Sequence, residues 1–75
     1  MELATRIRKI REAKGFTQAD VAYKANISPQ AYGKIERKAS RTKLVTLVKI
    51  SKVLEVSLVF LLDTNNLNYN ENNNS

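Results

Sequence analysis

The sequence predicts a small all-α domain of five helices. Its apolar residues recur at spacings of three and four, which is the period of an amphipathic helix. Capping residues stand directly before several of these apolar stretches and mark helix starts. With 75 residues and no cysteine, the chain is one domain near the lower size at which a single hydrophobic core is stable.

The first two predicted helices cover residues 2–13 and 18–25. One apolar stripe on the first helix is formed by Leu3, Ile7 and Ile10. Gly15 is placed to end this helix in the left-handed region. Thr17 is an N-cap for the second helix, and Asp20 three residues later complements the exposed N–H groups of its first turn.

A third helix is predicted for residues 29–36, with Ser28 as its N-cap and Pro29 at the first position, where a missing N–H costs nothing. Gly33 in its interior costs about 1 kcal/mol relative to alanine. Either a side chain there would be in the way, or the glycine is simply tolerated. Only residues 26–28 separate the second and third helices, so the two must cross steeply, as in a helix-turn-helix.

The remaining segments are two helices and a polar tail. The fourth helix is predicted to run over residues 44–54 with Thr42 as its cap, and Ser57 caps a short fifth helix that ends near Leu62. Residues 1–63 are therefore expected to form the domain. Residues 64–75 are dominated by asparagine, and we expect a disordered tail there, with a peptide that folds on binding as the alternative.

Composition narrows the function. The absence of histidine and cysteine excludes disulfides, thiolate or imidazole metal sites, and Ser-His or Cys-His catalysis. The carboxylates form no evident pair on one helix face, so neither an enzyme nor a cofactor is predicted. A formal charge of +6 suits a polyanion, most simply nucleic acid, although a solvated basic surface or an acidic membrane would fit equally. No apolar run is long enough to span a bilayer, which leads us to expect a soluble, intracellular domain.

The runs "RIRKIREAKGFTQADVAYKANISPQAYGKIER" and "LVTLVKISKVLEVSLVFLL" give the chain a family resemblance. Over residues 3–62 it resembles the Cro and phage-repressor type of helix-turn-helix domain, the xenobiotic-response-element family of bacterial regulators. The resemblance implies a compact, lambda-repressor-like domain that binds operator DNA, usually as a dimer. It also implies a cytoplasmic regulator of a bacterium or phage that works at the nucleoid.

The third helix is then the candidate recognition helix, and its outward positions are expected to face the major groove. The predicted base contacts are Pro29, Gln30, Gly33 and Lys34. Gln30 can bind adenine through its amide, and Lys34 can reach guanine or a phosphate. Ala31, Tyr32 and Ile35 are expected to point inward, with the Tyr32 hydroxyl at the rim. The alternative is that Gln30 and Lys34 are ordinary solvated positions.

Phosphate contacts are predicted around this helix. The candidates are Gln18, Ser28, Arg37, Lys38, Arg41 and Lys43. Gln18 resembles the family's phosphate clamp, because it stands at a helix N-terminus. Lys38 replaces the glycine that usually ends the recognition helix in the family, which leaves the loop geometry open. Arg11 and Glu36 match a structural ion pair of the family that would lock the recognition helix to the rest of the domain.

An apolar contact surface is predicted on the last two helices. Val45, Val59 and Phe60 stand where related sequences often carry acidic residues, and exposed apolar side chains of this kind indicate a contact patch. A twofold homodimer is the first interpretation. The alternatives are that Phe60 folds back into a small core, or that the domain is an antitoxin-like interaction module that binds another protein through this patch.

Overall fold

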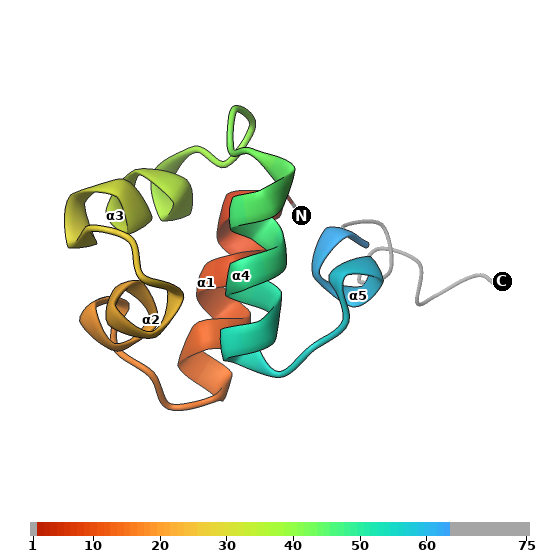
Figure 1. Cartoon of the computed structure of the whole chain (residues 1–75). Helices are drawn as coiled ribbons and strands as arrows, with labels where there is room; N and C mark the ends of the chain where they lie inside the picture. The colour runs from red at the N-terminus through yellow and green to blue at the C-terminus, as the bar shows by residue number, and fades with distance from the viewer. Residues whose placement is uncertain (1, 64–75) are drawn as a thin grey trace, which may run out of the picture.

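The computed structural model describes residues 2–63, and within them it contains five α-helices and no strand. The helices are α1 (Leu3–Ala13), α2 (Gln18–Ala25), α3 (Pro29–Arg37), α4 (Leu44–Leu54) and α5 (Leu58–Leu62) (Figure 1). The all-α, five-helix prediction is confirmed, with α1 beginning one residue later and α3 ending one residue later than expected. The predicted tail, residues 64–75, lies outside the described part of the chain.

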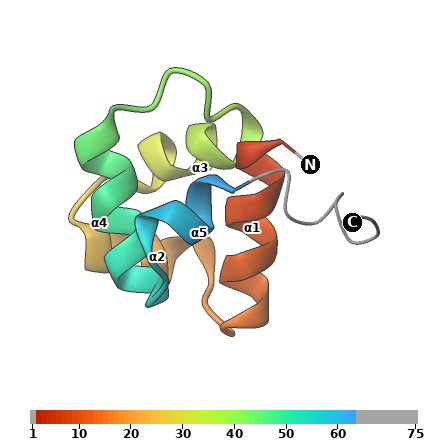
Figure 2. The ribbon, with the colours of Figure 1, turned by 90° about the vertical axis from the view of Figure 1, so that its right-hand side faces the viewer.

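Two groups of helices cover opposite sides of α1 and α4. Helices α2 and α3 pack on one side, where α3 contacts α1 and α2 contacts α4. The short helix α5 lies on the other side and contacts both α1 and α4 (Figure 2). The core between them takes apolar side chains from all five helices. The largest fully buried ones are Tyr32, Ile7, Ile50, Leu54, Leu61 and Val21.

Local capping sets the helix starts around the steep corner. The Thr17 hydroxyl accepts from the Asp20 N–H at 3.0 Å, and the Asp20 carboxylate accepts from the Thr17 N–H at 2.8 Å, which is a complete capping box. Ser28 caps α3 by accepting from the Ala31 N–H at 3.0 Å. Between these two starts, Asn26 ends α2 in the left-handed region at φ 59°, which asparagine tolerates better than most residues.

The connection from α3 to α4 differs from the prediction. Thr42 does not cap α4, because it lies one residue before the N-cap position. Its N–H closes a turn onto the Ala39 carbonyl at 2.9 Å. Lys43 holds the N-cap position instead, without a side-chain cap bond. Lys38 ends α3 at φ −159°. Since any residue adopts this extended backbone, the usual glycine is not required there.

No helix within residues 2–63 is both long and apolar enough to cross a membrane.

Candidate nucleic-acid interface

Helix α3 has a buried side and an exposed side. Tyr32, Ile35 and Glu36 face the interior, whereas Gln30 and Lys34 are exposed to solvent. Ala31 was expected on the inward side, but it is exposed. The side of α3 that packs against the domain therefore carries a carboxylate, and the opposite side carries the free polar groups.

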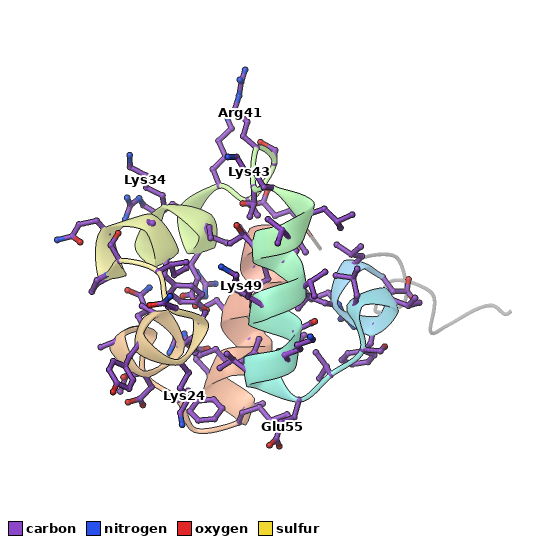
Figure 3. All side chains as sticks on the ribbon, in the orientation of Figure 1. Lys24, Lys34, Arg41, Lys43, Lys49 and Glu55 are labelled. Atoms are coloured by element: carbon purple, nitrogen blue, oxygen red, sulfur yellow. The ribbon has the colours of Figure 1, made fainter. Side chains whose placement is uncertain are left out.

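The exposed side of α3 and the start of α2 border one open groove of about 400 Å³. Its lining residues are Gln18, Pro29, Gln30, Gly33, Lys34 and Arg37. All four residues predicted to contact bases thus lie together with the predicted clamp, Gln18. Lys34 points away from the body of the domain (Figure 3). The groove offers amide, ammonium and guanidinium donors at one surface.

Gly33 is buried beneath neighbouring side chains of this groove. A Cβ atom at this position would be 3.4 Å from Arg37 Nη1 and 4.0 Å from Gln18 Oε1. The nearer of these atoms is the flexible end of an arginine at van der Waals distance, so nothing fixed blocks a side chain at this position.

A second open groove, of about 340 Å³, lies between α3 and the loop before α4. Its apolar lining includes Ile27, Ala31 and Ile35. Its cationic lining consists of Lys34, Lys38, Arg41 and Lys43. Figure 3 shows Lys34, Arg41 and Lys43 at the same edge of the molecule, whereas Lys24 and Lys49 lie elsewhere. Three of the predicted phosphate-contact residues are therefore gathered beside the outward side of α3.

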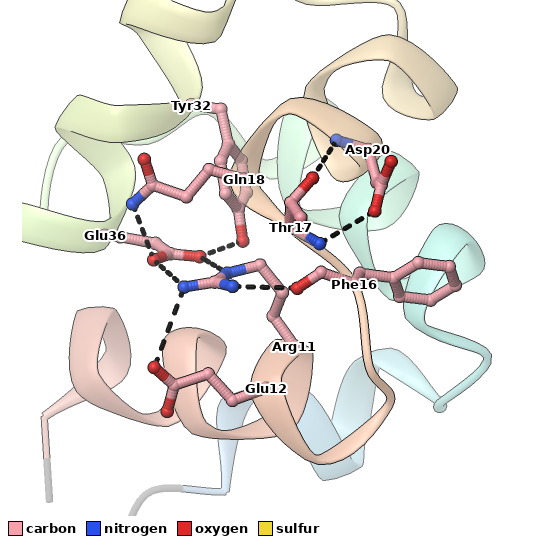
Figure 4. Close-up of polar contacts among 8 residues, drawn as sticks. All are labelled: Arg11, Glu12, Phe16, Thr17, Gln18, Asp20, Tyr32 and Glu36. Atoms are coloured by element: carbon pink, nitrogen blue, oxygen red, sulfur yellow. Dashed lines mark hydrogen bonds and ion pairs between the residues drawn. The ribbon is translucent and has the colours of Figure 1, made fainter.

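Arg11 and Glu36 form an ion pair behind α3 (Figure 4). Arg11 Nε donates to Glu36 Oε2 at 2.6 Å, and Nη2 donates to Oε1 at 3.1 Å. The remaining nitrogen of the guanidinium, Nη1, donates to the Phe16 carbonyl at 2.8 Å. The side chain of Glu36 is only 2% exposed and that of Arg11 is 11% exposed. The guanidinium therefore connects α1, the loop before α2, and α3.

Two further donors complete the surroundings of Glu36. The Tyr32 hydroxyl, which was expected at the rim, lies inside and donates to Oε2, and Gln18 Nε2 donates to Oε1 at 3.0 Å. Burial alone would raise the pKa of Glu36, but the hydrogen bonds from Arg11, Tyr32 and Gln18 outweigh it and hold the pKa below its ordinary value. Burial and the bond to Glu36 raise the pKa of Tyr32. The network therefore holds a charged carboxylate and a neutral phenol.

Gln18 and Ser28 each keep hydrogen-bonding capacity for another partner. A side-chain amide has two N–H groups, and Gln18 uses one for Glu36. Its position is fixed by this bond at the first residue of α2. The Ser28 hydroxyl accepts from Ala31, so its own hydrogen remains available to donate.

Arg6 is an important residue that the sequence interpretation missed. Only 2% of it is exposed, and Nε and Nη2 both donate to the Phe60 carbonyl, at 3.0 and 2.8 Å. Its guanidinium also lies 4.4 Å from the centre of the Phe60 ring, which is a cation–π distance. The helical spacing could have predicted its burial, because Arg6 is three residues from Leu3 and four from Ile10 and therefore lies on the same apolar face of the helix.

The predicted apolar patch is exposed. Val45 is 60% exposed, Val59 78% and Phe60 44%. Leu44 and Leu62, at 60% and 39%, belong to the same two helices and were not included in the prediction. Phe60 does not fold into the core, although one face of its ring contacts Arg6. We call these five residues the α4/α5 patch.

Among residues 2–63, no group of three or more acidic side chains is arranged to hold a metal ion.

Comparison with known proteins shows what this chain is similar to. Residues 7–61 match the helix-turn-helix family. The SPbeta prophage-derived uncharacterized HTH-type transcriptional regulator YonR of Bacillus subtilis (strain 168) is 42% identical over 57 residues, which is 76% of this chain and 53% of YonR. The chain thus spans about half the length of this curated relative.

Solved structures also match. A variant of the restriction-modification controller protein C.Esp1396I superposes with a TM-score of 0.79 and 38% identity, covering 89% of this chain and 91% of that chain. The structure of SinR, the master regulator for biofilm formation, in complex with DNA superposes with a TM-score of 0.77 and 33% identity, covering 83% of this chain and 100% of that chain. A chain of the SinR protein/SinI protein complex superposes with a TM-score of 0.81 and 30% identity, covering 93% of this chain and 69% of that chain.

Proposed function

Because the chain belongs to the helix-turn-helix family of the Cro and phage-repressor type, we propose that it is a DNA-binding transcriptional regulator, a repressor or controller protein without catalytic activity. The observation that carries the proposal is the two-sided character of α3. Its inward side is fixed by a buried carboxylate network, and its outward side presents the groove of Gln18, Gln30 and Lys34. A rigid helix with free polar groups on one side is what major-groove recognition requires.

The proposed roles follow the two grooves. Pro29, Gln30, Gly33 and Lys34 face base edges, and Gln18 and Ser28 bind phosphates near the N-termini of α2 and α3. The cations of the second groove, Lys38, Arg41 and Lys43, bind phosphates along the flanking backbone.

The proposed assembly is a homodimer through the α4/α5 patch, acting on an inverted repeat. Twofold symmetry would place the two α3 helices about 34–36 Å apart, one turn of DNA. The exposure of the patch supports the dimer interface, and the DNA complex of the similar protein SinR supports DNA as the binding partner. A regulator of this kind acts in the cytoplasm of a bacterium, at the nucleoid, with residues 1–63 as its DNA-binding domain.

Selection from a random duplex library at near-physiological salt tests the proposal. We expect an enriched inverted repeat. On that site, Gln30→Ala or Lys34→Ala should cost about 1–3 kcal/mol and relax the preference at one base pair per half-site. Lys43→Ala should instead weaken all sequences alike and flatten the dependence on salt. Binding without any enrichment, lost as salt rises, would contradict sequence-specific recognition.

A second candidate is a protein-interaction module. It is favoured by the likeness to SinR in its complex with SinI together with the exposed α4/α5 patch. In that case the library selection fails, while a Val59→Glu variant loses the protein partner.

A further inference from the structure

The side chain of Arg37 lies over Gly33, in the middle of the outward side of α3. Arg37 Nη1 is 3.4 Å from the place where a Cβ atom of residue 33 would be. The two residues are four positions apart, so they are neighbours on the same face of the helix. Side chains on a helix lean toward its N-terminus. The guanidinium therefore extends from the last residue of α3 back toward Gln30.

This placement separates Arg37 from the other cations that follow the recognition helix. Arg37 lines the groove of Gln18, Gln30 and Gly33, whereas Lys38, Arg41 and Lys43 line the second groove. Sequence position alone had grouped Arg37 with them as a phosphate contact. In the structure it belongs with the residues assigned to bases.

The neighbouring carboxylate does not retain the guanidinium. Both oxygens of Glu36 already accept hydrogen bonds, Oε1 from Arg11 and Gln18, and Oε2 from Arg11 and Tyr32. Glu36 is also turned inward, with a side chain that is 2% exposed, while Arg37 is exposed. The Glu36 carboxylate therefore pairs with groups inside the domain and not with Arg37.

We propose that Arg37 is a specificity-determining residue that binds a guanine in the major groove. The guanidinium carries parallel donors that match guanine O6 and N7, and this is the pairing that gives arginine its base specificity. The proposal rests on the proposed function, because it names a further contact of the same DNA site.

The test compares Arg37→Lys with Lys38→Ala on the selected site and on its single-base substitutions. Arg37→Lys keeps the charge but loses the planar fork. We expect it to reduce affinity for the best site about tenfold and to remove the preference for one G·C pair in each half-site. Lys38→Ala, which removes a neighbouring cation, should lower affinity for every site by the same factor.

The outcomes separate the two proposals. A native protein that enriches no sequence overturns the proposed function. A native protein that enriches an operator, together with an Arg37→Lys variant that loses affinity uniformly on all substituted sites, leaves the function intact and shows Arg37 to be a phosphate contact.

Discussion

Glu36 keeps a negative charge almost entirely out of solvent, and its stability contribution depends on Arg11. Arg11→Met should lower the free energy of unfolding by about 3–5 kcal/mol, because it leaves a buried carboxylate without its cation. Glu12→Ala is the matched control, because Glu12 is 3.9 Å from Arg11 and its side chain is 58% exposed, so its loss should be close to neutral. Urea unfolding of both variants measures the difference. Similar losses for the two would show that the buried pair has no special weight.

The Glu36 carboxylate should also make the free energy of unfolding depend on pH in the acidic range. The pKa of Glu36 is lower in the folded state than its ordinary value of about 4.3. Its contribution is therefore complete above that ordinary value and is lost as the pH falls through the folded-state pKa. Unfolding at a series of pH values from 7 to 3 should show this loss, and Glu36→Gln should be less stable at pH 7 with a shallower decline. An unchanged slope in Glu36→Gln would assign the acid dependence to other groups.

At the level of helices, Arg6 on α1 bonds α5 through the Phe60 carbonyl. Arg6→Met should destabilise the domain by about 1.5–3 kcal/mol, because the Phe60 carbonyl loses both charged donors. Arg8→Met is the control on the same helix, since Arg8 is exposed. Thermal unfolding gives the loss, and hydrogen exchange at the Leu61 amide, which bonds to the Ser57 carbonyl, shows whether α5 opens first. Equal Tm values for the two variants would contradict this role.

Helix starts were predictable where one residue determines them. Thr17, Ser28 and Ser57 each accept from an N–H three residues ahead, and such a bond depends only on nearby sequence. Thr42 fails as a cap because it stands one residue before the N-cap position, in a turn that its N–H closes onto the Ala39 carbonyl. That choice depends on how the loop packs, and Ala39 is itself part of the core. A local pattern does not contain this information.

At the scale of the whole molecule, the α4/α5 patch should determine the oligomeric state. Val59→Glu should give a folded monomer, because it places a charge at the proposed interface. The fold should tolerate the change, since Val59 is 78% exposed and does not belong to the hydrophobic core. Val59 is a cleaner probe than Phe60, whose ring also contacts Arg6. Tyr23→Glu is the control, since Tyr23 is 87% exposed but lies on α2. Sedimentation at several concentrations distinguishes the two, and a Val59→Glu dimer would exclude the patch as the interface.

The sequence allowed us to predict which residues lie at the candidate site, but not which way their side chains point. The helical period placed Gln30 and Lys34 on one face, and both line the same groove. The course of the Arg37 side chain over Gly33 and the inward turn of the Tyr32 hydroxyl depend on neighbouring side chains in three dimensions. Arg6 and Phe60 are 54 positions apart, so their contact appears only once the chain has folded.

The hydrogen-bond network around Glu36 also bears on how the DNA specificity of such a protein can evolve. Arg11, Tyr32 and Gln18 hold the helix through Glu36, while the exposed Pro29, Gln30 and Lys34 take no part in the hydrophobic core. After a gene duplication, substitutions at those three codons would retarget one copy at little cost in folding. Two copies in one cell could then diverge to separate operators while sharing one unchanged interior.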